Sequence, residues 1–159
     1  MSVPGYLAGP EPAMRLALEQ ARQLAGVGPG GDVPVGAVVL GPDGDVIGAG
    51  HNSCLAAGDP TAHAEIVAMR RAASALGAWR LDGCSLVVTL EPCTMCAGAV
   101  HLARIGRVVY GAIDARAGAA GSLSDVLRDR RLGPAVEVIG EVLAEECGQL
   151  LTEFFERLR

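Results

Sequence analysis

The chain has 159 residues, of which 50% are hydrophobic and 19% are charged, and its formal net charge is -5 at pH 7. This composition is typical of a folded globular chain and excludes an intrinsically disordered one. The 13 basic residues are all arginine, which excludes chemistry that depends on a P-loop lysine, a Schiff-base lysine or a lysine general base.

The charge and hydropathy patterns also bear on location and partners. No apolar run approaches the ~18 residues of a membrane span, and residues 1–10 lack the basic flank and apolar core of a signal peptide. We therefore expect a single domain over residues 1–159, located in the cytoplasm and without a membrane partner. The acidic balance argues against a broad basic surface, so that any RNA contact would be local.

The first half of the chain predicts two helices and a hairpin. Apolar residues recur at helical spacing over residues 12–27. The glycine-rich stretch 26–31 follows a helix and precedes a strand, which is the reverse of the dinucleotide-binding order, and we interpret it as a connector. Two β-branched runs, 33–40 and 45–50, flank a turn with Pro and Gly and predict a β-hairpin. The pair at positions 59–60, Asp-Pro, predicts the start of a second helix that runs to about residue 76.

The second half alternates strands with helices. Residues 85–90 predict a strand, and Pro92 begins a helix that ends before Gly106. A strand over 107–111, a short helix over 122–127, a strand over 135–139 and an amphipathic helix from residue 142 follow. This order favours an α/β fold with a single sheet covered on both faces, in which one antiparallel hairpin joins a mostly parallel set.

The cysteines point to a metal site. Five cysteines in a chain without an export signal argue against a disulfide framework. Cys93 and Cys96 are three residues apart on a predicted helix and face the same way, and His63 from the preceding helix can complete a set of ligands for Zn²⁺. Three protein ligands leave one tetrahedral position open to water, which is the catalytic arrangement. The start of a helix also favours thiolates and other anions.

Glu65 adds a candidate acid–base group to this set. A carboxylate beside the metal can take a proton from bound water and pass it to a substrate nitrogen. Residues two apart on a regular helix point about 200° from each other, so that His63 and Glu65 converge only if the metal lies beyond the tip of the helix.

Two other interpretations of these residues remain open. The first is a redox pair formed by Cys93 and Cys96. The second is a closed structural zinc site. Its fourth ligand would come from one of the candidates Cys54, Cys84, His51 and His101. Cys147 falls on the apolar face of the last predicted helix, and we expect it in the core.

The sequence around these residues resembles a known family. His-x-Glu at 63–65 followed by Pro-Cys-x-x-Cys at 92–96 is the signature of the zinc-dependent cytidine and nucleobase deaminases. Three segments closely resemble the bacterial tRNA-specific adenosine deaminases: 59–65 (DPTAHAE), 89–99 (TLEPCTMCAGA) and 111–122 (GAIDARAGAAGS). The resemblance implies a cytidine-deaminase-like three-layer α/β/α sandwich with a central mixed five-stranded sheet.

The resemblance also implies an activity. It is the hydrolytic deamination of adenosine to inosine at the wobble position of a tRNA anticodon, carried out by a homodimer without an organic cofactor. His63, Cys93 and Cys96 would hold a zinc ion in each chain, zinc-bound hydroxide would attack C6 of adenine, and Glu65 would be the proton shuttle.

Substrate contacts are implied at four positions. Asn52 and the backbone around Ala64 would hold the base, and an Asn side chain suits this because it offers both a donor and an acceptor. Asp114 and Arg116 would contact the anticodon stem-loop, with Arg116 in place of the family's usual lysine. Val33 and Leu55 are candidate walls of a pocket for one extruded base.

Two alternative functions remain open. A deaminase of a free base or nucleoside, of the guanine, cytosine or adenine type, would share every metal residue. A non-catalytic, zinc-stabilised RNA-binding subunit would keep the metal, but it would have no use for the acid at Glu65. Glu91, beside Pro92, receives no role from the sequence.

Overall fold

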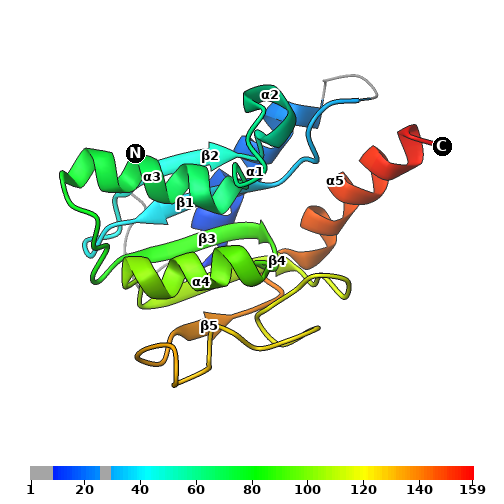
Figure 1. Cartoon of the computed structure of the whole chain (residues 1–159). Coiled ribbons are helices and arrows are strands. Elements are labelled where there is room, and N and C mark those ends of the chain that lie inside the picture. Colours follow the sequence, from blue (N-terminus) through cyan, green and yellow to red (C-terminus); the bar gives the residue numbers. More distant parts are fainter. Residues whose placement is uncertain (1–8, 26–29) are drawn as a thin grey trace.

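The computed structural model describes residues 9–25 and 30–159, and Figure 1 shows a sheet flanked by helices. In chain order the elements are α1 (Glu11–Ala25), β1 (Gly36–Leu40), β2 (Val46–His51), α2 (Cys54–Ala57), α3 (Ala64–Leu76), β3 (Ser85–Leu90), α4 (Thr94–Ala103), β4 (Arg107–Ala112), β5 (Glu137–Ile139) and α5 (Ala144–Arg157). Of the predicted connector at 26–31, residues 26–29 lie outside the described residues. No helix in the described part of the chain is long and apolar enough to cross a membrane.

The strands form one mixed sheet in the order β2-β1-β3-β4-β5, as the family resemblance predicted. β1 pairs antiparallel with β2 and also with β3, whereas β3, β4 and β5 are parallel. The element order predicted only the hairpin as antiparallel, so the antiparallel pairing of β1 with β3 is a difference from that prediction. It arises because α3 carries the chain from β2 past β1 to β3, so that β2 and β3 run in the same direction on either side of β1.

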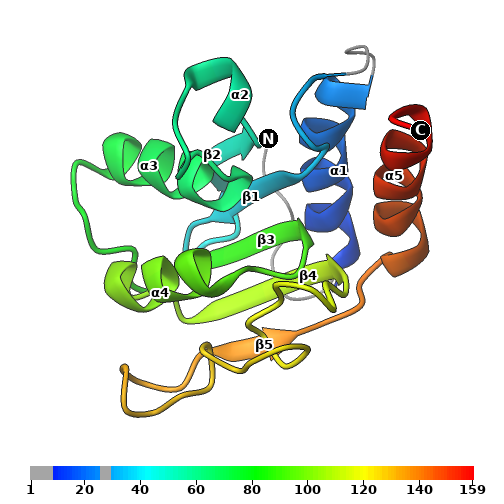
Figure 2. The same ribbon diagram turned by 45° about the vertical axis from the view of Figure 1, so that its right-hand side comes forward.

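Helices cover both faces of the sheet, which confirms the three-layer arrangement (Figure 2). Successive side chains of a strand point to opposite faces. Ala37 and Val39 of β1 pack in the cluster with α3 and α4, whereas Val38 packs in the cluster with α1 and α5. Cys147 of α5 is 1% exposed within the second cluster, which confirms its predicted place in the core.

The predicted short helix over 122–127 is wrong. This segment consists of turns and an isolated bridge between Ala120 and Asp125. The N–H of Ser122 donates to the Glu91 carboxylate at 3.1 Å. The N–H groups of Leu123 and Val126 bond to the carbonyls of Gly118 and Ala119, which are five and seven residues earlier and not the four of an α-helix. Gly121 also has a φ of 126°, which no residue of a right-handed helix adopts.

The start of the second long helix also differs from its prediction. α3 begins at Ala64 and not at the Asp-Pro pair, and the Asp59 carboxylate instead accepts the N–H of Thr61 at 2.8 Å. The sequence did not predict the short helix α2 at all. Its first-turn N–H groups, those of Leu55 and Ala56, donate to the Asp32 carboxylate at 2.7 and 3.0 Å, so a residue 23 positions earlier in the chain completes it.

The other predicted elements are present, β3 with the predicted bounds and the rest with shifted ends. β1 begins at Gly36 and not at 33, because the N–H of Val35 bonds to the Val33 carbonyl in a local turn. β5 begins at Glu137 and α5 at Ala144, each two residues later than predicted.

Glycines on the strands let helices approach the sheet closely. Substitution of Gly48 on β2 tests whether this close packing stabilises the fold. A Cβ at Gly48 would meet the Ala68 carbonyl oxygen and lie 2.7 Å from the backbone nitrogen of Ala72, both on α3. We expect Gly48→Ala to lower the free energy of unfolding by about 1–3 kcal/mol, measured by denaturant titration. The matched control is Gly148→Ala within α5, where no atom lies within 4 Å of the added Cβ. It should stabilise the protein by about 0.5–1 kcal/mol, and equal effects of the two substitutions would contradict the packing argument.

Candidate active site

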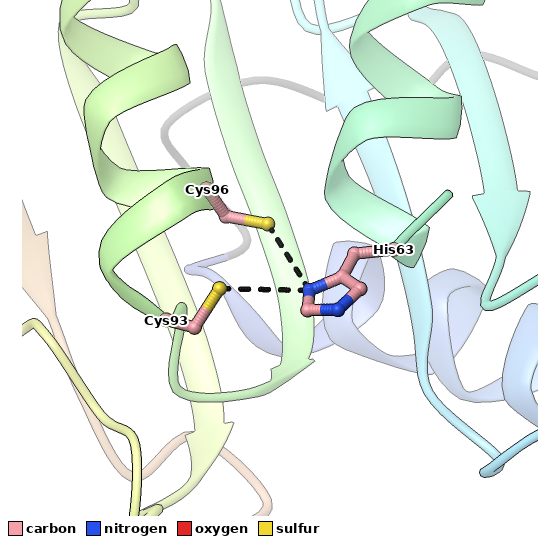
Figure 3. Close-up of side chains that lie close together, drawn as sticks. All are labelled: His63, Cys93 and Cys96. Atoms are coloured by element: carbon pink, nitrogen blue, oxygen red, sulfur yellow. Dashed lines mark hydrogen bonds between the residues drawn. The ribbon is translucent and has the colours of Figure 1, made fainter. Parts of the chain in front are cut away.

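The starts of α3 and α4 bring the three predicted metal ligands together. His63 is the N-cap residue of α3 and Cys93 is the N-cap residue of α4, both with extended backbone, and Cys96 lies in the first turn of α4. Figure 3 shows the two thiols facing the same ring nitrogen of His63. The site therefore lies beyond the tips of both helices, as the spacing of His63 and Glu65 required, and both helix dipoles present their positive ends to it.

The distances fit a tetrahedral zinc ion. The Sγ atoms of Cys93 and Cys96 each lie 3.5 Å from Nδ1 of His63, and the three atoms all lie within 4.8 Å of one another. Zn–S bonds of about 2.3 Å and Zn–N bonds of about 2.0 Å at the tetrahedral angle place sulfur and nitrogen ligands ~3.5 Å apart. One imidazole and two thiolates are also a donor set that zinc prefers, so these residues are positioned to bind it.

The two thiols differ in their affinity for a proton. A hydrogen bond from Cys96, together with His63, lowers the pKa of Cys93 to about 4. The same hydrogen bond, with burial, raises the pKa of Cys96 well above its ordinary value. The bond to Cys93 in turn raises the pKa of His63. Without a metal, the site therefore favours a thiolate at Cys93 and a thiol at Cys96, and metal binding must displace the remaining protons.

Glu65 lies beside these ligands but does not belong to their cluster. Its residue is only 4% exposed, in the first turn of α3. Burial raises the pKa of Glu65 to about 7, although its own backbone N–H and the charge on His63 oppose the shift. A carboxyl group with a pKa near 7 can both accept and donate a proton at neutral pH.

The residues considered as a fourth ligand lie elsewhere. Among residues 9–25 and 30–159, the cluster contains only His63, Cys93 and Cys96, and residues 1–8 and 26–29 include no His, Cys, Asp or Glu. The other candidates have partners of their own: Cys54 with the Pro60 carbonyl, Cys84 with that of Asp82, His51 with that of Asn52 and His101 with that of Val126. The open three-ligand arrangement is therefore the one that the described chain offers, and the closed structural site is not.

A cavity of about 180 Å³ adjoins the cluster and is lined in part by Val33, Asn52, Glu65 and Asp114. Asn52 donates from Nδ2 to the Val33 carbonyl at 3.3 Å, while its buried Oδ1 has no hydrogen-bond partner among the described residues. An acceptor oxygen is therefore available to a molecule in the cavity. Leu55, predicted as a wall, is instead 65% exposed and does not line the cavity.

The remaining predicted substrate contacts fall on two segments. Ala64 is buried at the start of α3 and lines the cavity. Asp114 also lines it, and its carboxylate accepts the N–H of Arg116 at 3.0 Å. The Arg116 side chain is exposed and lies outside the cavity lining.

Glu91 is a residue of this site that sequence reasoning missed. It is 1% exposed, it lines the cavity, and its carboxylate accepts backbone N–H groups from residues 23 to 31 positions later. No local pattern signals contacts over such separations. The one available signal was an acidic residue inside an otherwise apolar stretch that ends at the metal-binding cysteines.

Comparisons with known proteins agree with this chemistry. Residues 9–112 match the cytidine and deoxycytidylate deaminase zinc-binding region. The tRNA-specific adenosine deaminase of Haemophilus influenzae is 46% identical over 149 residues, which cover 94% of this chain and 84% of that protein. A solved structure from a study of A-to-I editing by tRNA:A34 deaminases superposes with a TM-score of 0.79 and 42% identity, covering 87% of this chain and 98% of that one. A guanine deaminase structure from Bacillus subtilis superposes with a TM-score of 0.61 and 42% identity, covering 70% and 69% of the two chains.

Removal of one thiol tests the metal site. We expect Cys96→Ala to lose most of its zinc, measured by metal analysis of the purified protein, and to melt at a lower temperature because metal binding contributes to folding. Cys54→Ala is the matched control, since this thiol lies on α2 and contacts the Pro60 carbonyl. It should keep its zinc, and a Cys96→Ala protein with full zinc content would rule out Cys96 as a ligand.

Proposed function

Since this chain belongs to the cytidine and deoxycytidylate deaminase zinc-binding family, we propose that it is the zinc-dependent hydrolase that converts adenosine to inosine at the wobble position of tRNA. The observation that carries the chemistry is the buried Glu65 beside the open cluster of His63, Cys93 and Cys96. The substrate class follows from the tRNA-specific adenosine deaminase that is 46% identical over nearly the whole chain. We place the activity in the cytoplasm, where tRNA is processed and used.

The reaction consumes water and releases ammonia, and Glu65 moves the protons. When bound, zinc lowers the pKa of a coordinated water toward ~7 and so supplies a nucleophile at neutral pH. Glu65 accepts a proton from the attacking water and passes it to the ring nitrogen of adenine. It then accepts the second proton, from the hydroxyl group added at C6, and delivers it to the amino group, which leaves as ammonia. Burial suits it to both directions of transfer, because it raises the pKa of Glu65 to about 7.

Two polar groups hold the base in this proposal. Oδ1 of Asn52, which is buried without a partner in the described chain, accepts a hydrogen bond from a base N–H group. The N–H of Ala64 lies in the first turn of α3, where helical donors have no partner within the helix, and it donates to the base. The small cavity beside Glu65 suits one extruded base and not a stacked strand.

The loop of residues 113–122 would meet the rest of the anticodon stem-loop. Arg116 is exposed on this loop and offers a charge to a phosphate, while Asp114 fixes the local backbone by accepting the N–H groups of Arg116 and Ala117. The net charge of -5 makes such a local contact more important, because the protein lacks general attraction for RNA.

The free-base alternative has a specific observation in its favour, which is the similarity to a guanine deaminase structure over 70% of this chain. Its site would need the same metal and the same acid. The non-catalytic subunit is disfavoured, since the buried carboxyl group of Glu65 beside the metal cluster serves no purpose in a purely structural zinc site.

The proposed assembly is a homodimer that forms over α3 and α4. An apolar groove between these helices is lined by Ile66, Met69, Trp79 and Leu102, and Trp79 and Leu102 are 69% and 76% exposed. Contiguous exposed apolar residues of this kind mark an interaction surface, and a second copy of the chain can bury the same patch on both partners.

Activity on RNA distinguishes the proposal from its rivals. The protein should convert a single adenosine to inosine in an anticodon stem-loop with adenosine at the wobble position, and it should leave free guanine, cytosine and adenine unchanged. Glu65→Gln should retain zinc and lose about 10²- to 10⁴-fold in turnover, as expected when a general acid–base is removed. Glu156→Gln, at an exposed position on α5, is the control. Deamination of a free base without activity on the stem-loop would establish the alternative, and full turnover by Glu65→Gln would refute the role of Glu65.

The dimer is tested by a charge placed in the groove. Leu102→Glu should convert the protein to a monomer in sedimentation or light-scattering measurements, because a buried unpaired carboxylate is costly at an apolar interface. Leu158→Glu, at a 50% exposed leucine near the end of the chain, should leave the assembly unchanged. A monomeric unmodified protein, or a dimeric Leu102→Glu, would exclude this interface.

A further inference from the structure

Glu91 is a buried carboxylate, and its side-chain partners among the described residues lie in one loop. Its Oε2 accepts the N–H of Asp114 at 2.9 Å, and its Oε1 accepts the N–H groups of Ala120 and Ser122 at 3.3 and 3.1 Å. A carboxylate that is only 1% exposed requires such bonds, because burial removes its hydration. One side chain thus holds both ends of the 113–122 loop through charge-assisted hydrogen bonds. We call these three hydrogen bonds the clamp.

The backbone around Glu91 is joined to the same loop. The N–H of Ala119 donates to the Pro92 carbonyl at 2.8 Å, and Cys93 forms an isolated bridge with Gly118. A Cβ at Gly118 would overlap the Glu91 carboxylate, so only glycine permits this approach. The segment that leads into the metal ligands and the 113–122 loop are therefore fitted to each other at adjacent positions.

The clamped loop forms part of the cavity wall. Asp114 and Ala117 line the cavity together with His63 and Glu65. The chemical groups themselves come from α3 and α4, whose buried residues pack in the main core cluster. The loop contains none of the three residues of the metal cluster and not the proton shuttle Glu65, so its conformation bears on what reaches the cavity and not on the chemical step.

We infer that Glu91 is a positioning residue that holds the 113–122 loop in the conformation that receives the RNA flanking the target adenosine. This inference rests on the proposed function, because it takes RNA as the molecule that meets the loop. Glu91 acts through the backbone N–H groups of Asp114, Ala120 and Ser122. Its loss therefore weakens RNA binding while bound RNA is still converted.

Two variants disrupt the clamp from opposite sides. Glu91→Gln replaces one acceptor oxygen by a donor that faces backbone N–H groups. Gly118→Ala inserts a methyl group against the intact carboxylate and 2.5 Å from the Asp114 carbonyl oxygen of the same loop. We expect each to raise KM for the anticodon stem-loop by about tenfold and to leave kcat within about twofold. The double variant should be no worse than the more impaired single variant, because both act on one contact.

Hydrogen exchange provides a readout that does not depend on activity. In Glu91→Gln the amides of Asp114, Ala120 and Ser122 should exchange faster than in the unmodified protein, while the amides of α1 should be unchanged. Zinc content should also remain unchanged. Leu18→Ala, in the core cluster on the α1 face of the sheet, is the control for lost stability and should leave KM unaltered.

Each outcome has a defined meaning. Unchanged KM in both clamp variants, a fall in kcat alone, or loss of zinc would overturn the inference, since Glu91 would then act as a core residue or through the metal ligands. If Glu91→Gln does not fold, Gly118→Ala carries the same test with the carboxylate in place. If the unmodified protein has no activity on the stem-loop, the proposed function fails, and the RNA role of Glu91 fails with it. Failure of the inference alone is seen instead in the variants, as an unchanged KM in a protein whose unmodified form is active.

Discussion

The parallel direction of β2 and β3 is the constraint on which the site depends. Both strands end at the same edge of the sheet, where α4 begins directly after β3 and α3 begins after β2 and the short helix α2. His63 and Cys93 occupy the N-cap positions of these two helices, so the path of the chain alone brings them together. Ligands of α/β proteins bind at the carboxyl ends of strands for the same reason.

Sequence reasoning succeeded where the signal was local. The spacing of His63, Glu65, Cys93 and Cys96 reflects contacts within one helical turn or across two adjacent helix starts, and the structure places the metal ligands in reach of one ion. The failures share a cause, because the deciding contact comes from far along the chain. Asp32 completes α2 from 23 residues away, and Glu91, 31 residues earlier in the chain, holds Ser122 in a loop where the sequence predicted a helix.

Three buried carboxylates show that the surroundings of a carboxyl group decide its role. Asp32 and Glu91 are 6% and 1% exposed and accept backbone N–H groups from segments that they hold in place. Glu65 is similarly buried, but the loss of hydration on burial is the main influence on its pKa, which rises to about 7. Two of these groups are fixed by their hydrogen bonds, whereas the third is poised to exchange a proton.

The Asn52 side chain determines what kind of selectivity the cavity can have. Its amide is anchored through Nδ2 to Val33, and the oxygen at the other end is withdrawn from solvent with no partner in the described residues. A ligand with a hydrogen-bond donor at that point gives the Asn52 oxygen a partner and so removes the free-energy cost of its burial. A ligand of equal size without such a donor leaves that cost in place. An unsatisfied polar group produces a larger difference in affinity than a mismatch of shape in an apolar pocket. The cavity therefore discriminates between heterocycles by the positions of the hydrogen-bond donors on their edges.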